Sequence, residues 1–303
     1  MSLQFDFVKL IGRLDLRLLW AGLLIQPLML LGFVLGAVRL AILASTPAAP
    51  ILLALKATIL SCGFNSLLPG RVAEILKATY LRNHAGVPFS AGIAGVLVER
   101  MMDLLMVMVI GIFAIGFAVI GTGITAYVAV ALTLSVILVL LSSRQSMLLA
   151  LIGRLPWAFV RNSATPLLTQ AFVRLTGAVT FQALFLSALI WIVAIGNVAL
   201  FLALAGTIPI GVKGALFVFV ACTLGAAIPA LPAGLGTYEA AAVLSLSALG
   251  YGFDEALAIG LALHASQIVL SLLGALSIAA IERIGVTEAI RETVAFVRPS
   301  PKS

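Results

Sequence analysis

Long apolar runs, separated by short polar segments, divide this chain into candidate membrane spans. Helices over residues 18–38, 88–120, 180–205 and 254–281 are each long enough to cross a hydrocarbon core of about 30 Å. A shorter run at residues 126–141 is a fifth candidate. Because these runs are too apolar for the surface of a soluble protein, the pattern predicts an all-α polytopic membrane protein.

Two further apolar segments are interrupted by proline and glycine. Residues 51–83 break at 68–70 (LPG), and residues 215–250 break at 232–236 (PAGLG). Proline lacks an amide hydrogen and clashes with the preceding helical turn, while glycine accepts backbone angles that other residues avoid. Irregular backbone at membrane depth is tolerated only where protein or a wet cavity satisfies it. We therefore expect two broken, re-entrant helix pairs; a pair of short spans at each place is the alternative.

The two halves of the chain repeat the same order of span, broken pair and span. The first repeat covers about residues 18–120 and the second about 180–282, in opposite orientation. This is the plan of transporters with inverted repeats, whose binding sites lie where broken helices meet. Residues 126–141 connect the repeats and a basic loop follows at 142–179, so residues 1–303 are expected to form a single transmembrane domain.

The composition agrees with a membrane protein. Of 303 residues, 63% are hydrophobic and 10% are charged, and the mean hydropathy is +1.24, which excludes a soluble or disordered chain. The net charge of +7 is not gathered on a soluble face, so no nucleic acid is expected as a partner. Cys62 and Cys222 lie in apolar runs and are interpreted as small buried side chains. We expect no metal site and no cofactor.

Most of the 18 basic residues lie in residues 39–87, 142–179 and 282–303. The positive-inside rule then predicts a multi-pass protein of the cell (inner) membrane with a cytosolic C-terminus. Counting the predicted crossings back from a cytosolic C-terminus places the N-terminus outside, although the few charges of residues 1–17 give this assignment little support. Arg39, at the end of the first span, is interpreted as an interface anchor.

Arg71 and Glu74, next to the first break, are candidate substrate-binding residues. Arg71 follows Pro69 and Gly70 in the first turn of a half-helix, whose free amides favour an anion such as a phosphate. Its guanidinium can add a planar, bidentate contact to phosphate oxygens. Glu74 is expected to hold Arg71 or to exchange a proton. The alternative is a cytosolic connector with a local ion pair.

The second break offers corresponding candidates at Gly234, Gly236, Thr237 and Glu239. The glycines allow a ligand or a helix to approach closely, and Thr237 is a candidate N-cap. Glu239 is flanked by apolar sequence, where a carboxylate is costly unless it is paired, hydrated or protonated. His264, in the last span, either contacts substrate or is a buried histidine held by a hydrogen bond.

Glu99, Arg100 and Asp103 place charges inside the span at 88–120. Glu99 and Asp103 share one face of the helix, because residues four apart are neighbours on a helix surface. We expect them to form a structural clamp that holds Arg71 or Lys77, with direct contact to substrate as the alternative.

Two motifs resemble those of a known family. Residues 65–105, NSLLPGRVAEILKATYLRNHAGVPFSAGIAGVLVERMMDLL, resemble the N-x-x-LPGR-x-G/A-E … ER-x-x-D signature of the flippase-like membrane family typified by the transmembrane domain of lysyl-phosphatidylglycerol synthase, which includes AglD-like and YbhN-like proteins. Residues 229–250, PALPAGLGTYEAAAVLSLSALG, are similar to its second motif, P-x-x-PGGLG-x-x-E, with Ala233 in place of a glycine. By position, the resemblance marks Asn65, Pro69, Gly70, Arg71, Glu74, Glu99, Arg100, Asp103, Pro232, Gly234, Gly236 and Glu239.

The resemblance implies movement of an anionic or phosphate-bearing lipid between leaflets. Two alternatives stay open: a secondary transporter of a small anionic solute with Glu239 or Glu74 as proton carrier, and a non-transporting partner of a lipid-modifying or glycosyl-transferring membrane enzyme. No catalytic motif occurs, and the aminoacyl-transferase domain of the lysyl-phosphatidylglycerol enzymes is absent from these residues, so enzymatic activity is not expected. A membrane lipid is the expected partner; a homodimer and a membrane enzyme are further candidates.

Overall fold

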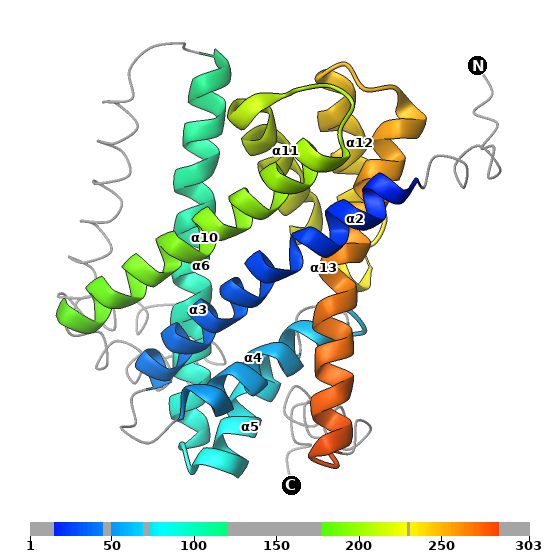
Figure 1. The fold of residues 1–303 in the computed structure, drawn as a ribbon. Coiled ribbons are helices and arrows are strands. Elements are labelled where there is room, and N and C mark those ends of the chain that lie inside the picture. Colours follow the sequence, from blue (N-terminus) through cyan, green and yellow to red (C-terminus); the bar gives the residue numbers. More distant parts are fainter. Residues whose placement is uncertain (1–14, 45–49, 69–72, 120–176, 229–230, 285–303) are drawn as a thin grey trace, which may run out of the picture.

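The computed structural model describes residues 15–44, 50–68, 73–119, 177–228 and 231–284. Within these ranges every regular element is a helix (Figure 1). The first half contains α2 (Leu16–Leu24), α3 (Gln26–Ala44), α4 (Ile51–Asn65), α5 (Glu74–Ala85) and α6 (Phe89–Val119). The second half contains α10 (Gly177–Ala205), α11 (Gly211–Ala227), the short 3-10 helix η2 (Pro232–Gly234), α12 (Thr237–Ala248) and α13 (Phe253–Ile281). The expectations for residues 126–141 and 142–179, and for Pro69, Gly70 and Arg71, lie outside the described residues.

Among the described residues, three helical stretches are long and apolar enough to cross a membrane: α2 with α3 (Leu16–Ala44), α10 and α13, each with 29 residues. Large hydrophobic side chains cover much of their outer surface, for example Trp20 at 61%, Phe181 at 72% and Leu273 at 58% exposure. Such a surface is stable in lipid and costly in water. The expected all-α membrane protein is therefore confirmed for the described residues.

The first span differs from its prediction. It was expected to end at Val38, with Arg39 anchored at the interface, but α3 continues to Ala44 and Arg39 is only 3% exposed. The anchor interpretation of Arg39 is wrong, because carboxylates of α6 neutralise this charge inside the bundle. The span is interrupted at Ile25, two residues before the helix-breaking Pro27.

The two predicted breaks are present as interruptions between short helices. The helices α4 and α5 have 15 and 12 residues, and α11 and α12 have 17 and 12. At 1.5 Å per residue they are about 18–26 Å long, which is less than the ~30 Å of a hydrocarbon core. In the second break the backbone of Ala233, Gly234 and Gly236 is left-handed, with φ of 58°, 75° and 84°. Glycine tolerates this conformation, and Ala233 adopts it in place of a motif glycine.

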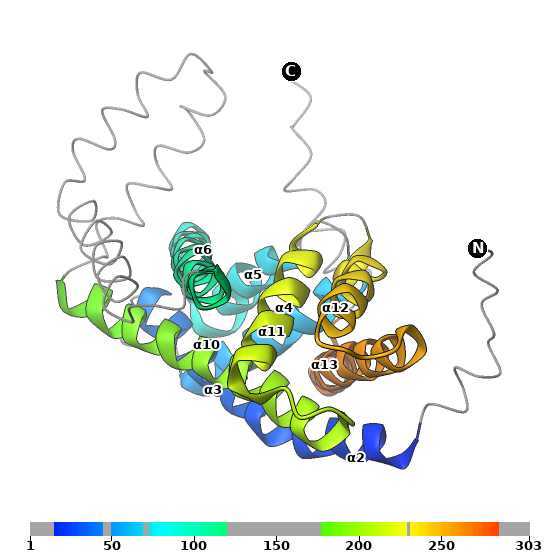
Figure 2. The ribbon, with the colours of Figure 1, turned by 90° about the horizontal axis from the view of Figure 1, so that it is seen from above.

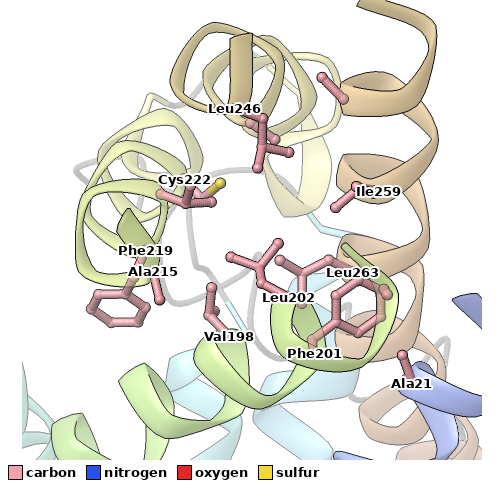
Figure 3. Close-up of a cluster of buried hydrophobic side chains, with 14 of the residues drawn as sticks. Ala21, Val198, Phe201, Leu202, Ala215, Phe219, Cys222, Leu246, Ile259 and Leu263 are labelled. Carbon is pink, nitrogen blue, oxygen red and sulfur yellow. The ribbon is translucent and has the colours of Figure 1, made fainter. Parts of the chain in front are cut away.

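The short helices lie between the long ones. Seen from above (Figure 2), α10, α3 and α2 form one side of the bundle, and α4, α11 and α12 lie between α6 and α13. The helix α4 packs on α13, α5 on α6, α12 on both α11 and α13, and α10 on α3. One core cluster joins α2 to α10–α13, with Phe201, Leu202 and Leu263 facing Leu246 and Ile259 (Figure 3). A second cluster joins α3, α4 and α5 to the end of α13. The short helices are thus held by long helices on both sides.

Candidate functional site

Two cavities lie in the interior of the bundle. The first, here called the break cavity, has a volume of about 470 Å³ and is lined by both interruptions, including Asn65 and Leu68 from one and Leu231 and Pro232 from the other. The second, called the apolar cavity, has a volume of about 410 Å³ and lies against α3, α10 and α11. Its walls are largely apolar, with Leu28, Met29, Phe33, Ile190, Val193 and Ala194 among them. The two interruptions, far apart in the sequence, therefore meet at one space.

The two cavities adjoin each other. Five side chains line both of them, and together they are called the shared wall: Cys62, Lys77, Arg100, Tyr238 and Gln267. The wall contains two cations, a phenol and an amide, which can all donate hydrogen bonds. A polar group in either cavity can therefore meet the same donors.

Charged side chains of α5 and α6 pair around this wall. Lys77 Nζ lies 2.8 Å from Glu99 Oε2, and Arg100 Nε lies 3.1 Å from Glu74 Oε2. Arg100 also reaches Asp103, with Nη2 at 3.2 Å from Oδ2. Lys77 and Glu99 are 4% and 1% exposed, so each needs the other as a counter-charge. The expected clamp for Lys77 is present, and Glu74 pairs with Arg100.

Arg39, which lies on α3, adds a third cation to this group of charges. Its Nη1 lies 2.7 Å from Asp103 Oδ1 and donates to Ser187 Oγ at 2.8 Å, and its Nε lies 3.5 Å from Glu99 Oε1. We call the result the six-charge network: Arg39, Glu74, Lys77, Glu99, Arg100 and Asp103. Three cations and three carboxylates alternate in it, beginning and ending on α5, so the network is balanced in charge. Sequence reasoning missed Arg39, because its partner Asp103 lies 64 residues away.

The second break is held by Glu239. Its Oε2 accepts a hydrogen bond from the Gly236 amide at 2.6 Å, and its Oε1 lies 2.6 Å from His264 Nδ1. Both side chains are buried, at 8% and 5% exposure. The Tyr238 ring stacks on the His264 ring, with centroids 4.0 Å apart and an interplanar angle of 11°. His264 thus matches the interpretation of a buried, hydrogen-bonded histidine, but it also lines the break cavity.

Thr237 does not have its predicted role. It is the first residue of α12, whose N-cap is Gly236, and its Oγ1 donates to Gly234 O at 2.9 Å. The N-cap prediction is wrong because the helix begins one residue earlier than predicted, so Thr237 is already inside its first turn. A Cβ at Gly234 would lie 2.8 Å from the Cα of Ala226, so only glycine fits there without movement. Gly234 therefore provides close packing between the second break and α11.

Several buried polar atoms at the cavities have no hydrogen-bond partner among the described residues. Ser61 Oγ and Asn65 Oδ1 belong to residues that line the break cavity, and Asn197 Oδ1 to one that lines the apolar cavity. The Tyr238 hydroxyl lies in the shared wall. Unsatisfied buried groups are costly, and a polar ligand or water can satisfy them. Among the residues that the structure describes, no group of three His, Cys, Asp or Glu side chains is placed to hold a metal ion.

Comparison with known families gives one match. The family model described as "Lysylphosphatidylglycerol synthase TM region" matches residues 4–274. The match includes both motifs quoted above and confirms their resemblance to this family. Neither the curated proteins nor the solved structures gave a match.

Proposed function

Because the chain belongs to the family of lysylphosphatidylglycerol synthase TM regions, we propose that it moves an anionic or phosphate-bearing lipid between the leaflets of the membrane. The observation that carries this proposal is the pair of adjoining cavities with cations in their shared wall. A lipid has an apolar and a charged part, and the apolar cavity offers apolar walls together with Lys77 and Arg100. The proposed activity is transport rather than catalysis.

The arrangement of helices supports an inverted repeat of re-entrant pairs. In chain order α3, α4, α5 and α6 correspond to α10, α11, α12 and α13, and in each half the third helix packs on the fourth. Helices of 12 to 17 residues are shorter than the roughly 20 residues of a full span. In this proposal the two breaks enter from opposite sides of the cell (inner) membrane, the C-terminus is cytosolic, and the break cavity lies near the middle of the bilayer.

Arg100 is proposed as the cation that meets the headgroup. Its side chain is 34% exposed, compared with 5% for Lys77 and 4% for Arg39. It lines both cavities and is held by Glu74 and by Asp103. A lipid phosphate can displace one of these carboxylates and take its place, because Arg binds both groups with the same planar donors. Asp103 is the carboxylate that can be displaced at the lower cost, because it keeps its contact with Arg39, whereas Glu74 has Arg100 as its partner.

Arg71 is proposed as a second substrate-binding residue, on the strength of its place after Pro69 and Gly70 in the family motif. Removing its guanidinium should cost about 1.5–3 kcal/mol of headgroup binding, which corresponds to a roughly ten- to hundredfold weaker affinity. Fold stability should change little in this variant.

The test is movement of a fluorescent phosphatidylglycerol in phosphatidylcholine vesicles that contain the purified protein. A membrane-impermeant quencher reports how fast the probe reaches the outer leaflet. Arg71→Ala should slow this movement at least tenfold at low probe concentration, and Arg82→Ala, which removes an exposed arginine near the end of α5, is the matched control. Thermal unfolding of the same preparations separates loss of function from loss of fold.

Two outcomes contradict the proposal. If vesicles with the wild-type protein move the probe no faster than protein-free vesicles, lipid movement is not the function. A folded Arg71→Ala protein that moves the probe at the wild-type rate would leave lipid movement standing and exclude Arg71 from the site. Equal loss in the Arg82→Ala control would show that the assay reports general damage.

A further inference from the structure

The Glu239–His264 pair differs from the ion pairs of the six-charge network in one respect. The cations of that network are lysine and arginine side chains, which ordinarily stay charged near neutral pH, whereas histidine ordinarily gains and loses its proton there. Glu239 binds this histidine at 2.6 Å in the interior of the bundle. Among the described residues, this is the pair at the break cavity whose charge can change under physiological conditions.

The pair occupies a place equivalent to that of Lys77 and Glu99. Lys77 is the fourth residue of α5 and Glu99 the eleventh of α6. Glu239 is the third residue of α12 and His264 the twelfth of α13. Each pair therefore joins the short helix after a break to the long helix that follows it. The first repeat has a permanent ion pair at this place, and the second repeat has a titratable one.

The difference between the lysine pair and the histidine pair matters because of the charge balance at the described site. Three cations face three carboxylates in the six-charge network, so the network has no surplus positive charge. An anionic headgroup in the break cavity adds one negative charge to a poorly solvated space, which is costly unless a positive charge arrives with it. A proton on His264 supplies that charge, because His264 lines the same cavity.

We propose that the protein carries one proton together with each anionic headgroup, and that the Glu239–His264 pair is the site of this proton. The inference rests on the lipid movement proposed above. A carboxylate only accepts hydrogen bonds, so the hydrogen between the two side chains belongs to His264 Nδ1, and Nε2 is the nitrogen that takes up the proton. The proton binds as the headgroup enters from one leaflet and leaves as the headgroup departs to the other. No covalent bond of the lipid changes, and net charge is conserved.

The other titratable groups around the pair do not compete for this role. Cys62 of α4, Glu74 and Lys77 of α5, Arg100 of α6 and Tyr238 of α12 line the break cavity with His264. Cys222 of α11 lines the apolar cavity with Tyr238. Thiols and phenols ordinarily ionise above neutral pH, and Glu74, Lys77 and Arg100 have charged partners in the network.

The experiment uses the same vesicles with a pH difference of one unit across the membrane and the electrical potential clamped at zero by potassium and valinomycin. Cotransport of one proton with one anion should concentrate fluorescent phosphatidylglycerol about tenfold in the leaflet that faces the alkaline side. A fluorescent phosphatidylcholine, with no net charge, should remain evenly distributed.

Variants assign the effect to this pair. His264→Gln should abolish the asymmetric distribution, while His84→Gln, which replaces the other histidine of the chain at the end of α5, should retain it. Glu239→Gln keeps a hydrogen-bond acceptor beside His264 but removes the charge that stabilises the imidazolium. It should weaken the asymmetric distribution, and it provides the test of the pair if His264→Gln fails to fold.

The outcomes separate this inference from the proposed function. Wild-type protein that moves the anionic probe but distributes it evenly under the pH difference would overturn proton coupling and leave lipid movement intact. Wild-type protein that moves no probe at any pH would overturn both. Asymmetry that survives in folded His264→Gln, or disappears in His84→Gln, would overturn the assignment to His264.

Discussion

At the scale of single residues, the structure depends on charges that are buried and paired. Lys77 and Glu99 are the clearest case, because both are nearly inaccessible and lie 2.8 Å apart, whereas Arg39 lies 3.5 Å from Glu99. Removing one partner of such a pair leaves the other charge without compensation, which typically costs 3–5 kcal/mol. The network is therefore needed by the fold as well as by the proposed transport.

The first prediction tests this pair. Lys77→Met should lower the free energy of unfolding by about 3 kcal/mol, measured by denaturant or thermal unfolding in detergent micelles. The double variant Lys77→Met/Glu99→Gln should be less destabilised than the sum of the single changes, because it removes both charges together. Additive effects would show that the two groups do not interact, and a Lys77→Met protein as stable as wild type would contradict the buried pair itself.

A second prediction concerns Glu282, which directly follows α13. Its Oε1 lies 2.5 Å from Lys56 Nζ, and its Oε2 accepts a hydrogen bond from the Tyr80 hydroxyl at 2.6 Å. Burial acts to raise the pKa of Glu282, but the contacts from Lys56 and Tyr80 outweigh it and hold this pKa below the ordinary value. A carboxylate with a lowered pKa stabilises the fold above its unfolded-state pKa, and this contribution is lost as the pH falls.

Glu282→Gln should therefore lower the free energy of unfolding by about 1–2 kcal/mol at neutral pH. The difference from wild type should narrow as the pH falls below about 4.3, the ordinary pKa of glutamate. Unfolding curves of both proteins over a series of pH values provide the measurement. A difference that stays constant down to the lowest pH would show that the charge of Glu282 is not the cause.

At the scale of helices, close approach between α4 and α13 is one feature that holds the two halves of the chain together. A Cβ added to Gly63 would lie 2.4 Å from both the Cβ of Ala275 and the backbone oxygen of Ser271. Small residues at helix interfaces allow such packing, which stabilises helix association in membranes. The end of α4 is thus fixed against α13 directly beside the first break.

Gly63→Ala should force α4 and α13 apart and cost about 1–3 kcal/mol, as overpacking does in a close-packed interior. Gly196→Ala in α10 is the matched control, because a Cβ there meets nothing within 4 Å. Thermal unfolding of both variants provides the comparison. The predicted contact is absent if Gly63→Ala is as stable as the Gly196→Ala control.

The helices themselves could be predicted from the sequence better than their contacts. Pro50 and Pro88 directly precede α4 and α6, because proline fits the start of a helix and disrupts its interior. Both interruptions could be predicted, because proline and glycine occur together there in apolar sequence. The place of Arg39 did not follow, since a charge near the end of an apolar run has the same local pattern whether it faces an interface or a partner 64 residues away.

Pairing could be predicted only where both partners share one local motif. The clamp of Glu99 on Lys77 was among the expected pairings, because both residues lie in the motif of residues 65–105, and the structure adds Arg39 to it. The bond from Glu239 to His264 was not expected, because it joins two helices whose relative rotation a single sequence does not specify. The sequence thus indicated that Glu99 and Glu239 lie in apolar surroundings, but the fold decides which charges meet.

At the scale of the whole molecule, the ends of the helices settle which loops share one side of the membrane. The helix α13 has 29 residues and is about 43 Å long, so its two ends lie on opposite sides of a ~30 Å hydrocarbon core. Glu282 at its end binds Lys56 and Tyr80. The end of α13 therefore lies on the same side as the start of α4 and the end of α5. The positive-inside rule predicts that this side faces the cytosol, because these segments are basic.

This arrangement gives a prediction for single cysteines in a chain whose Cys62 and Cys222 are replaced by alanine. A membrane-impermeant thiol reagent applied to intact cells should label Asp254→Cys, at the exposed start of α13. It should fail to label Asn83→Cys and Arg283→Cys until the membrane is opened, because both positions are exposed at the side predicted to face the cytosol. Labelling of Asn83→Cys and Arg283→Cys with protection of Asp254→Cys would reverse the orientation. Different results for Asn83→Cys and Arg283→Cys would contradict the contact between α5 and the end of α13, on which the shared side depends.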